Sequence, residues 1–226
     1  VPIAPPRWQM PYTEQDNEFA EQVLQAFKPT GYHKNNGANE DNKVLVISPA
    51  ASKKARNWLP ERYAAVATHA FEQGFKVVLT GGPTVMEREL ADAISQHCDF
   101  ELLDLIGKTS LKQLLCVLKH PDMVIAPDTG PAHMATTVGT PVIGLYAHSN
   151  PKRTGPYNSQ DYVVEVYHHN LQQQFGKTAD QLPWGKRCKG EDLMSQIQID
   201  AVIKAFDQLC AHIASTKELS HEEGNE

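Results

Sequence analysis

Residues 123–146 read MVIAPDTGPAHMATTVGTPVIGLY, and this segment determines the type of fold. Apolar runs of strand length lie at its two ends, at residues 123–126 and 142–146. Residues 132–138 between them can form a short helix, which Gly139 ends as a C-cap residue. A connection of this length joins parallel strands, so the segment predicts a βαβ unit.

The polar turn of this segment carries the candidate chemistry. Thr129 and Gly130 begin the short helix, and Pro131 suits its first turn, where no backbone N–H is needed. The free N–H groups there form a site for a phosphate or diphosphate at the carboxyl end of the strand. Gly130 permits a close approach, Thr129 offers a hydroxyl, and Asp128 can accept from a sugar hydroxyl. The turn alone fits a plain helix cap equally well.

Composition places the chain among globular proteins. It has 226 residues, 41% of them hydrophobic and 21% charged, and a net charge of −6, which gives no support for a nucleic-acid partner. Its four cysteines are scattered, so we expect reduced thiols in a cytoplasmic protein. No apolar run approaches the roughly 20 residues of a membrane span.

Strands alternate with helices along the chain. Further strands are predicted at residues 43–48, 75–80, 102–105 and 162–166, and helices at 14–27, 60–73, 85–97, 110–119 and 193–213. This alternation predicts an α/β fold with a Rossmann-like, doubly wound and mainly parallel sheet. The chain lacks G-x-G-x-x-G after the first strand, a P-loop and a G-x-S-x-G elbow, which disfavours nicotinamide binding, P-loop NTPases and α/β-hydrolases.

Three regions follow from this pattern. Residues 1–42 are expected to form a proline-rich linker, an N-terminal helix and a loop, and residues 43–213 the Rossmann-like domain. Residues 175–190 within the domain are predicted to be irregular. Residues 214–226 are polar and acidic, so a disordered tail is expected there.

The loop after the first predicted strand offers positive charge. Small residues at 50–52 are followed by Lys53, Lys54 and Arg56. This run is either a solvated surface or a diphosphate site that includes Ser52 and the cations. We favour the second interpretation because carboxyl ends of parallel strands share one edge of the sheet, so this loop should open beside Asp128.

Two further candidates are weaker. Glu87 falls in the first turn of a predicted helix, where it either complements the helix dipole or binds ribose, and its spacing favours the first role. His168 and His169 are adjacent and therefore point to different sides, and no third ligand is suitably spaced. We expect no metal site there and no cofactor.

The eight residues 128–135 have the pattern D-T-G-P-x-H-x-A, which resembles the donor-site motif of glycosyltransferase family 9, the ADP-heptose:lipopolysaccharide heptosyltransferases. By this resemblance Asp128, Thr129, Gly130 and His133 bind the sugar donor. Arg56 stands two places before a tryptophan, where the family often has lysine, and would contact the nucleotide diphosphate through its planar guanidinium.

Other segments extend the resemblance from residue 44 to residue 155. The pattern G-G-P-x-x-x-E that ends at Glu87 is similar to a family turn and implies that Glu87 meets the nucleoside. Leu145 and Tyr146 match the family pattern L-Y-G-x-T, from which Ala147 and His148 depart. The role of this loop is therefore open.

The resemblance implies the donor-binding half of a GT-B enzyme that inverts the anomeric centre without a metal. Its partners would be a nucleotide sugar, with an ADP-sugar implied, and a lipopolysaccharide core acceptor, and the full enzyme would associate peripherally with a membrane. The catalytic base would come from an N-terminal domain missing from this chain. We therefore expect this chain to bind donor and to transfer sugar poorly. Two alternatives stay open, namely half of a 2-epimerase-like nucleotide-sugar enzyme and a non-catalytic nucleotide-binding module.

Overall fold

The computed structural model describes residues 8–28 and 43–223, with side chains to residue 216. Most of the predicted linker and of the loop before the first strand lies outside these residues. Among the described residues, no helix is long and apolar enough to cross a membrane.

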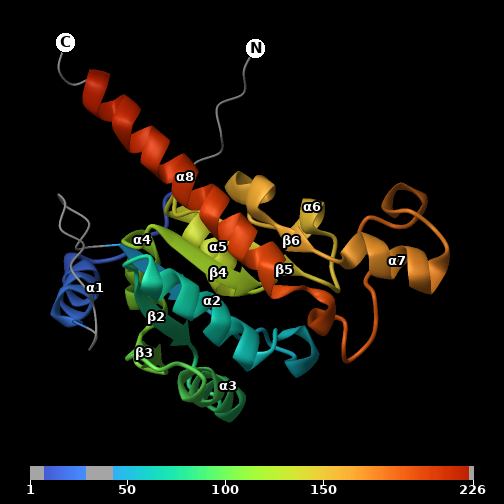
Figure 1. The fold of residues 1–226 in the computed structure, drawn as a ribbon, viewed down its shortest axis with the longest axis horizontal. Coiled ribbons are helices and arrows are strands. Elements are labelled where there is room, and N and C mark those ends of the chain that lie inside the picture. Colours follow the sequence, from blue (N-terminus) through green and yellow to red (C-terminus); the bar gives the residue numbers. More distant parts are fainter. Residues whose placement is uncertain (1–7, 29–42, 224–226) are drawn as a thin grey trace.

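A six-stranded parallel sheet forms the centre of the chain (Figure 1). Its strand order is β3-β2-β1-β4-β5-β6, which is the order of a doubly wound Rossmann sheet. All five neighbouring pairs are parallel. The strands are β1 (Val44–Ile47), β2 (Lys76–Gly81), β3 (Leu103–Ile106), β4 (Met123–Pro127), β5 (Val142–Tyr146) and β6 (Val164–Glu165). The predicted fold class is confirmed.

The central strands β1, β4 and β5 are apolar because both faces of the sheet are covered. Successive residues of β1 enter different cores, with Leu45 and Ile47 in one cluster and Val44 and Val46 in the other. Each of these four side chains is at most 7% exposed. Such strands read as continuous apolar runs, which is why they could be located from the sequence.

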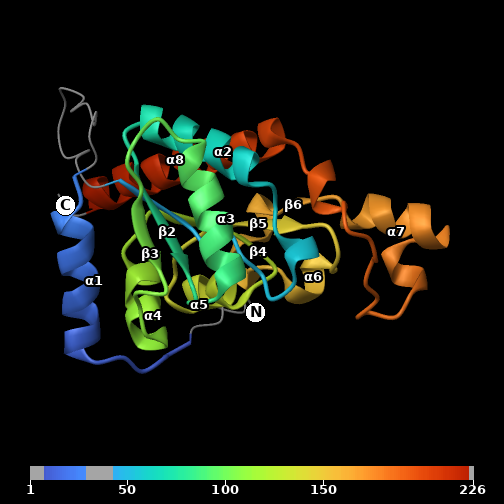
Figure 2. The same ribbon diagram turned by 90° about the horizontal axis from the view of Figure 1, so that it is seen from below.

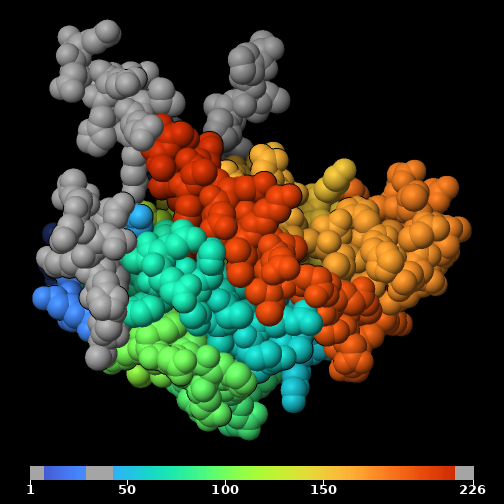
Figure 3. Space-filling model, viewed as in Figure 1, coloured from blue at the N-terminus to red at the C-terminus, as the bar shows by residue number. Residues whose placement is uncertain are grey.

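Helices cover the two faces in separate layers (Figure 2). Helices α2 (Pro60–Glu72), α3 (Val85–Gln96) and α8 (Ile199–Glu223) pack on one face. Helices α1 (Glu14–Ala26), α4 (Leu111–Lys119) and α5 (Gly130–Thr137) pack on the other. In Figure 3, α8 runs diagonally across the surface beside α2. Short elements complete the chain: α6 (Pro151–Thr154), α7 (Tyr167–Phe175) and 3-10 turns at Lys54–Arg56, Tyr157–Tyr162, Ala179–Gln181 and Met194–Gln196.

Local sequence explains several helix ends. Thr13 caps α1 in a capping box, in which its hydroxyl accepts from the Asp16 N–H and the Asp16 carboxylate accepts from the Thr13 N–H. Ser110 and Gln113 form the same arrangement at α4. Gly139 follows α5 with φ +85°, the left-handed conformation that glycine adopts at least cost.

The C-terminal third differs most from the sequence expectations. Strand β6 has only two residues, because residue 162 belongs to a 3-10 turn, and α7 occupies residues that had no predicted helix. The terminal helix begins at Ile199 rather than at residue 193, after a separate 3-10 turn. It continues to Glu223 and so includes residues 214–223, for which a disordered tail was expected. A helix already nucleated adds residues at little cost.

Candidate functional site

The candidate site lies where the strand order reverses. Strands β1 and β4 are neighbours in the sheet, although the chain runs from β1 to β2 on one side and from β4 to β5 on the other. The loops that follow β1 and β4 therefore diverge and leave a crevice at the carboxyl edge, the usual ligand position in such sheets. Both predicted donor loops, residues 48–58 and 128–133, start at this edge.

The two loops are joined directly. The hydroxyl of Thr129 donates to the carbonyl of Ala50 at 3.3 Å, and the hydroxyl of Ser149, after β5, donates to the Asp128 carboxylate at 2.6 Å. Thr129 occupies the N-cap position of α5, but no side-chain capping hydrogen bond is formed there. A plain helix cap does not account for the contacts that Asp128 and Thr129 make. The first turn of α5 keeps its amide dipoles available at the crevice.

Two hydrogen bonds fix the loop that follows β1. The carbonyl of Pro49 accepts from the buried hydroxyl of Tyr63, and the Ala51 N–H donates to the Asn57 side chain at 2.7 Å. The 3-10 turn Lys54–Arg56 then leaves Ser52 and Lys53 exposed and Arg56 half-buried. Because of this turn, Arg56 faces the crevice, whereas Lys53 and Lys54 face solvent.

A small pocket brings predicted residues from both loops together. Arg56 and Asp128 line it with Met194 and with residues 145–149, which are the end of β5 and the start of the loop that follows. The indole N–H of Trp58 fixes the Met194 segment in place, because it donates to the Ile197 carbonyl at 3.1 Å. The side chain of Arg62 donates to the same carbonyl and to that of Ser195.

Two residues outside the predicted set belong to this site, His148 and Arg187. The His148 carbonyl accepts from the Cys188 N–H at 2.9 Å, and His148 Nε2 lies 3.0 Å from the carbonyl of Gly190. These contacts place the segment that contains Arg187 beside Arg56. The sequence feature that could have indicated Arg187 is the basic run Lys186-Arg187-Cys188-Lys189. This run lies in a region that was expected to be irregular.

Burial and like charges lower the pKa values of two residues at this pocket. Burial lowers the pKa of Arg56, the charge of Arg187 lowers it further, and Asp128 opposes both effects. Burial also lowers the pKa of His148; the Gly190 carbonyl opposes this, and the charges of Arg56 and Arg187 add to the lowering. Asp128 and Glu191 oppose part of this lowering, but Arg56, which lines the pocket, remains under the influence of the like charge of Arg187. An added anion would relieve their mutual repulsion.

The structure does not bring the other predicted residues into this pocket. Glu87 turns back on its own loop, where its carboxylate accepts from the Gly82 N–H and, at 3.2 Å, from the Thr84 hydroxyl. His133 is exposed on α5 and does not line the pocket. The nucleoside role of Glu87 and the donor role of His133 stay predictions.

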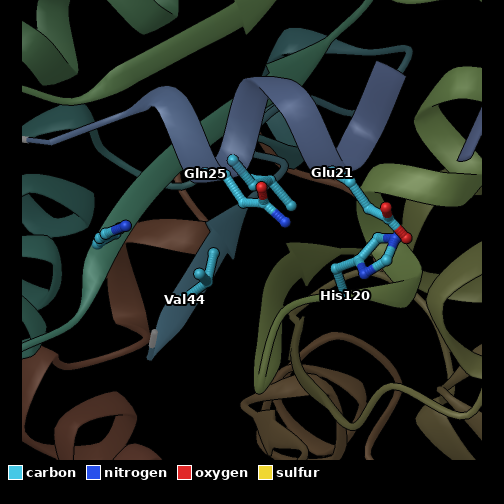
Figure 4. Close-up of a pocket in the computed structure, with 6 residues that line it drawn as sticks. Glu21, Gln25, Val44 and His120 are labelled. Atoms are coloured by element: carbon cyan, nitrogen blue, oxygen red, sulfur yellow. The ribbon is translucent and has the colours of Figure 1, made fainter. Parts of the chain in front are cut away.

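Two other features carry less weight. His168 Nδ1 pairs with Glu165 at 2.8 Å, and the described residues contain no group of three or more metal-ligating side chains that could hold an ion. A separate hollow lies under α1, lined by Glu21, Gln25, Val44 and His120 among others (Figure 4). It is at the amino ends of β1 and β2, which is the edge opposite the crevice.

Comparison with known proteins decides the family. The family model described as glycosyltransferase family 9 (heptosyltransferase) matches residues 1–184. The chain belongs to glycosyltransferase family 9. Lipopolysaccharide core heptosyltransferase OpsX of Haemophilus influenzae is 42% identical over 209 residues, which are 92% of this chain and 56% of that protein. Lipopolysaccharide heptosyltransferase 3 of Escherichia coli K12 is 27% identical over 73% of this chain and 46% of that protein.

Solved structures of family 9 proteins share the fold. A glycosyl transferase of family 9 from Veillonella parvula has a TM-score of 0.67 at 20% identity and covers 91% of this chain and 54% of its own. E. coli ADP-heptose LPS heptosyltransferase II has a TM-score of 0.61 at 19% identity, over 92% of this chain and 54% of its own. This family 9 chain thus spans about half the length of the relatives it matches.

Proposed function

We propose that this chain is the donor-binding half of a heptosyltransferase and that its crevice binds a nucleotide sugar, with ADP-heptose as the expected donor. One observation carries the proposal. The first turn of α5, which has no side-chain cap, and the pocket lined by Arg56 and Asp128 lie at the edge where the strand order reverses. The charge of Arg187 acts on Arg56. Structural relatives of this chain include E. coli ADP-heptose LPS heptosyltransferase II and E. coli heptosyltransferase WaaC with ADP, which supports an adenine nucleotide.

The arrangement suits departure of a nucleoside diphosphate. When the bond between the anomeric carbon and the diphosphate breaks, negative charge grows on the leaving group and the sugar becomes oxocarbenium-like. Two guanidinium groups and the amide dipoles of Gly130 and its neighbours would stabilise that charge. We infer that these groups take the place of a divalent metal. Thr129 and Ser52 offer further hydroxyl donors at the same edge.

The acceptor and the catalytic base are assigned to the other half of the enzyme. The relatives named above act on lipopolysaccharide, so we propose a lipopolysaccharide core acceptor for the complete protein. We infer inversion at the anomeric carbon, with a base supplied by the part that this chain does not cover. The chain alone should therefore bind donor and transfer sugar poorly.

Calorimetric titration with ADP, UDP and GDP, in the presence of EDTA and then of magnesium, tests this proposal. We expect ADP to bind, with an affinity that magnesium does not change. Arg56→Ala should weaken ADP binding by about 10- to 100-fold, the value of one charged hydrogen bond. Lys204→Ala, an exposed cation on α8, is the matched control and should bind as the wild type does. Preference for UDP, or sugar transfer by this chain at the rate of a full-length relative, would contradict it.

A further inference from the structure

His148 presents an unusual combination of burial and an unused hydrogen-bonding atom. Its side chain lines the same pocket as Arg56 and Asp128, and only 8% of the residue is exposed. Nδ1 has no hydrogen-bond partner among the described residues, whereas Nε2 lies against the Gly190 carbonyl. A buried polar atom without a partner costs free energy, so its retention calls for an explanation.

The Gly190 carbonyl determines what Nδ1 can do. A carbonyl oxygen only accepts, so the 3.0 Å contact requires the proton on Nε2. Nδ1 of the neutral ring then carries a lone pair and is an acceptor. The two neighbouring guanidinium groups, from Arg56 and Arg187, disfavour a second proton on the ring. The pocket therefore offers the Arg56 guanidinium to a diphosphate, and His148, which also lines it, carries at Nδ1 an acceptor without a partner among the described residues.

We propose that His148 determines donor specificity by accepting a hydrogen bond at Nδ1 from a hydroxyl group of the bound nucleotide sugar. This inference rests on the proposed function and adds a residue that the motif of the family does not contain. The hydroxyl belongs either to the ribose or to the transferred sugar. Either one would approach with its diphosphate held by Arg56 and Arg187.

The assignment of the acceptor to Nδ1 is tested by two substitutions, each of which can replace one ring nitrogen with an amide atom. His148→Gln can place its amide near Nε2 and keep the contact with Gly190, but it loses the acceptor at Nδ1. His148→Asn can place its oxygen near Nδ1 and keep the acceptor. Binding of ADP-heptose should weaken about tenfold in His148→Gln and much less in His148→Asn. The melting temperature of His148→Gln should not fall, since the substitution removes an unpartnered atom.

Three ligands distinguish the source of the hydroxyl. If His148→Gln weakens ADP-heptose but not ADP, the hydroxyl belongs to the transferred sugar. The hydroxyl belongs to the ribose if His148→Gln weakens the binding of both ADP-heptose and ADP, and if 2′-deoxy-ADP or 3′-deoxy-ADP binds the wild type and the variant equally. A nitrogen-detected NMR titration of wild-type chain provides a second readout, in which ADP-heptose should shift the Nδ1 resonance of His148. His97→Gln, an exposed histidine at the end of α3, serves as control.

The outcomes separate this inference from the proposed function. Unchanged binding of every ligand by His148→Gln, with the expected loss in Arg56→Ala, would overturn the role of His148 and leave the donor site intact. Equal losses in His148→Gln and His148→Asn would overturn the assignment to Nδ1. A wild-type chain that binds neither ADP nor ADP-heptose would contradict the proposed function, and this inference would fail with it.

Discussion

Arg187 provides the sharpest prediction, because its position follows from the fold and from no motif. The residue is exposed and does not line the pocket, but its charge acts on both Arg56 and His148, which do. We expect Arg187→Ala to weaken ADP binding. Arg187→Lys should recover part of the loss, since lysine keeps the charge but not the planar fork.

The size of the effect follows from its exposure. Two unit charges 4 Å apart interact by about 1 kcal/mol in water and by about 4 kcal/mol at a partly screened protein surface. Arg187 is exposed, so a loss of about 1–2 kcal/mol is expected, which is roughly a 5- to 30-fold rise in Kd. Arg56 is less exposed and should lose more. The effect of Arg187 should also shrink in high salt, which screens exposed charges.

Calorimetric titration with ADP at low and high salt measures this prediction. Lys189→Ala is a matched control, because it removes an exposed cation two positions along the same segment. The double variant of Arg56 and Arg187 measures how strongly the two guanidinium groups are coupled. An unchanged Kd in Arg187→Ala, or an equal loss in Lys189→Ala, would refute the idea that this segment contributes a specific charge to the site.

Other predictions concern the same loops. Ser149→Ala removes the 2.6 Å hydrogen bond to Asp128 and should weaken ADP binding by roughly 3- to 10-fold, with little change in melting temperature. A folded variant that binds ADP normally would exclude a role of Ser149 in positioning Asp128. Gly155→Ala would place a Cβ 2.3 Å from the Pro151 carbonyl, so urea denaturation should show a loss of about 1–3 kcal/mol; an unchanged midpoint would contradict this backbone packing. The pKa of His148 is lowered in the folded chain, so below about pH 6.5 the unfolded chain binds more protons than the folded chain does. The free energy of unfolding should therefore decrease as the pH is lowered. His148→Gln should flatten that dependence, and an identical slope would argue against it.

The sequence predicted most of the sheet, because buried parallel strands are continuous apolar runs. Residues 43–48 and 75–80 could be recognised in this way, and Thr13 marked the start of α1. Helix α7 was missed because Tyr167–Phe175 contains mostly polar residues with weak apolar periodicity. The start of α8 was placed too early because Leu193, Met194 and Ile197 are all buried, and their spacing imitates one face of a helix.

The candidate site was predictable to the extent that it follows from the carboxyl-edge rule. Arg56 and Asp128 come from loops after neighbouring strands, and the structure places both at one pocket. His148 and Arg187 could not be found in this way. Their placement depends on contacts between residues about 40 positions apart, such as that between His148 and Gly190. Arg187 and Gly190 themselves lie in a stretch without helix or strand.

A structure of this chain with ADP would test the central claim most directly. We expect the diphosphate at the carboxyl edge of β1 and β4, within hydrogen-bonding distance of the Arg56 guanidinium and the first turn of α5, with Arg187 nearby. A diphosphate bound at the opposite edge, in the hollow under α1, or one that contacts neither Arg56 nor α5, would contradict the account.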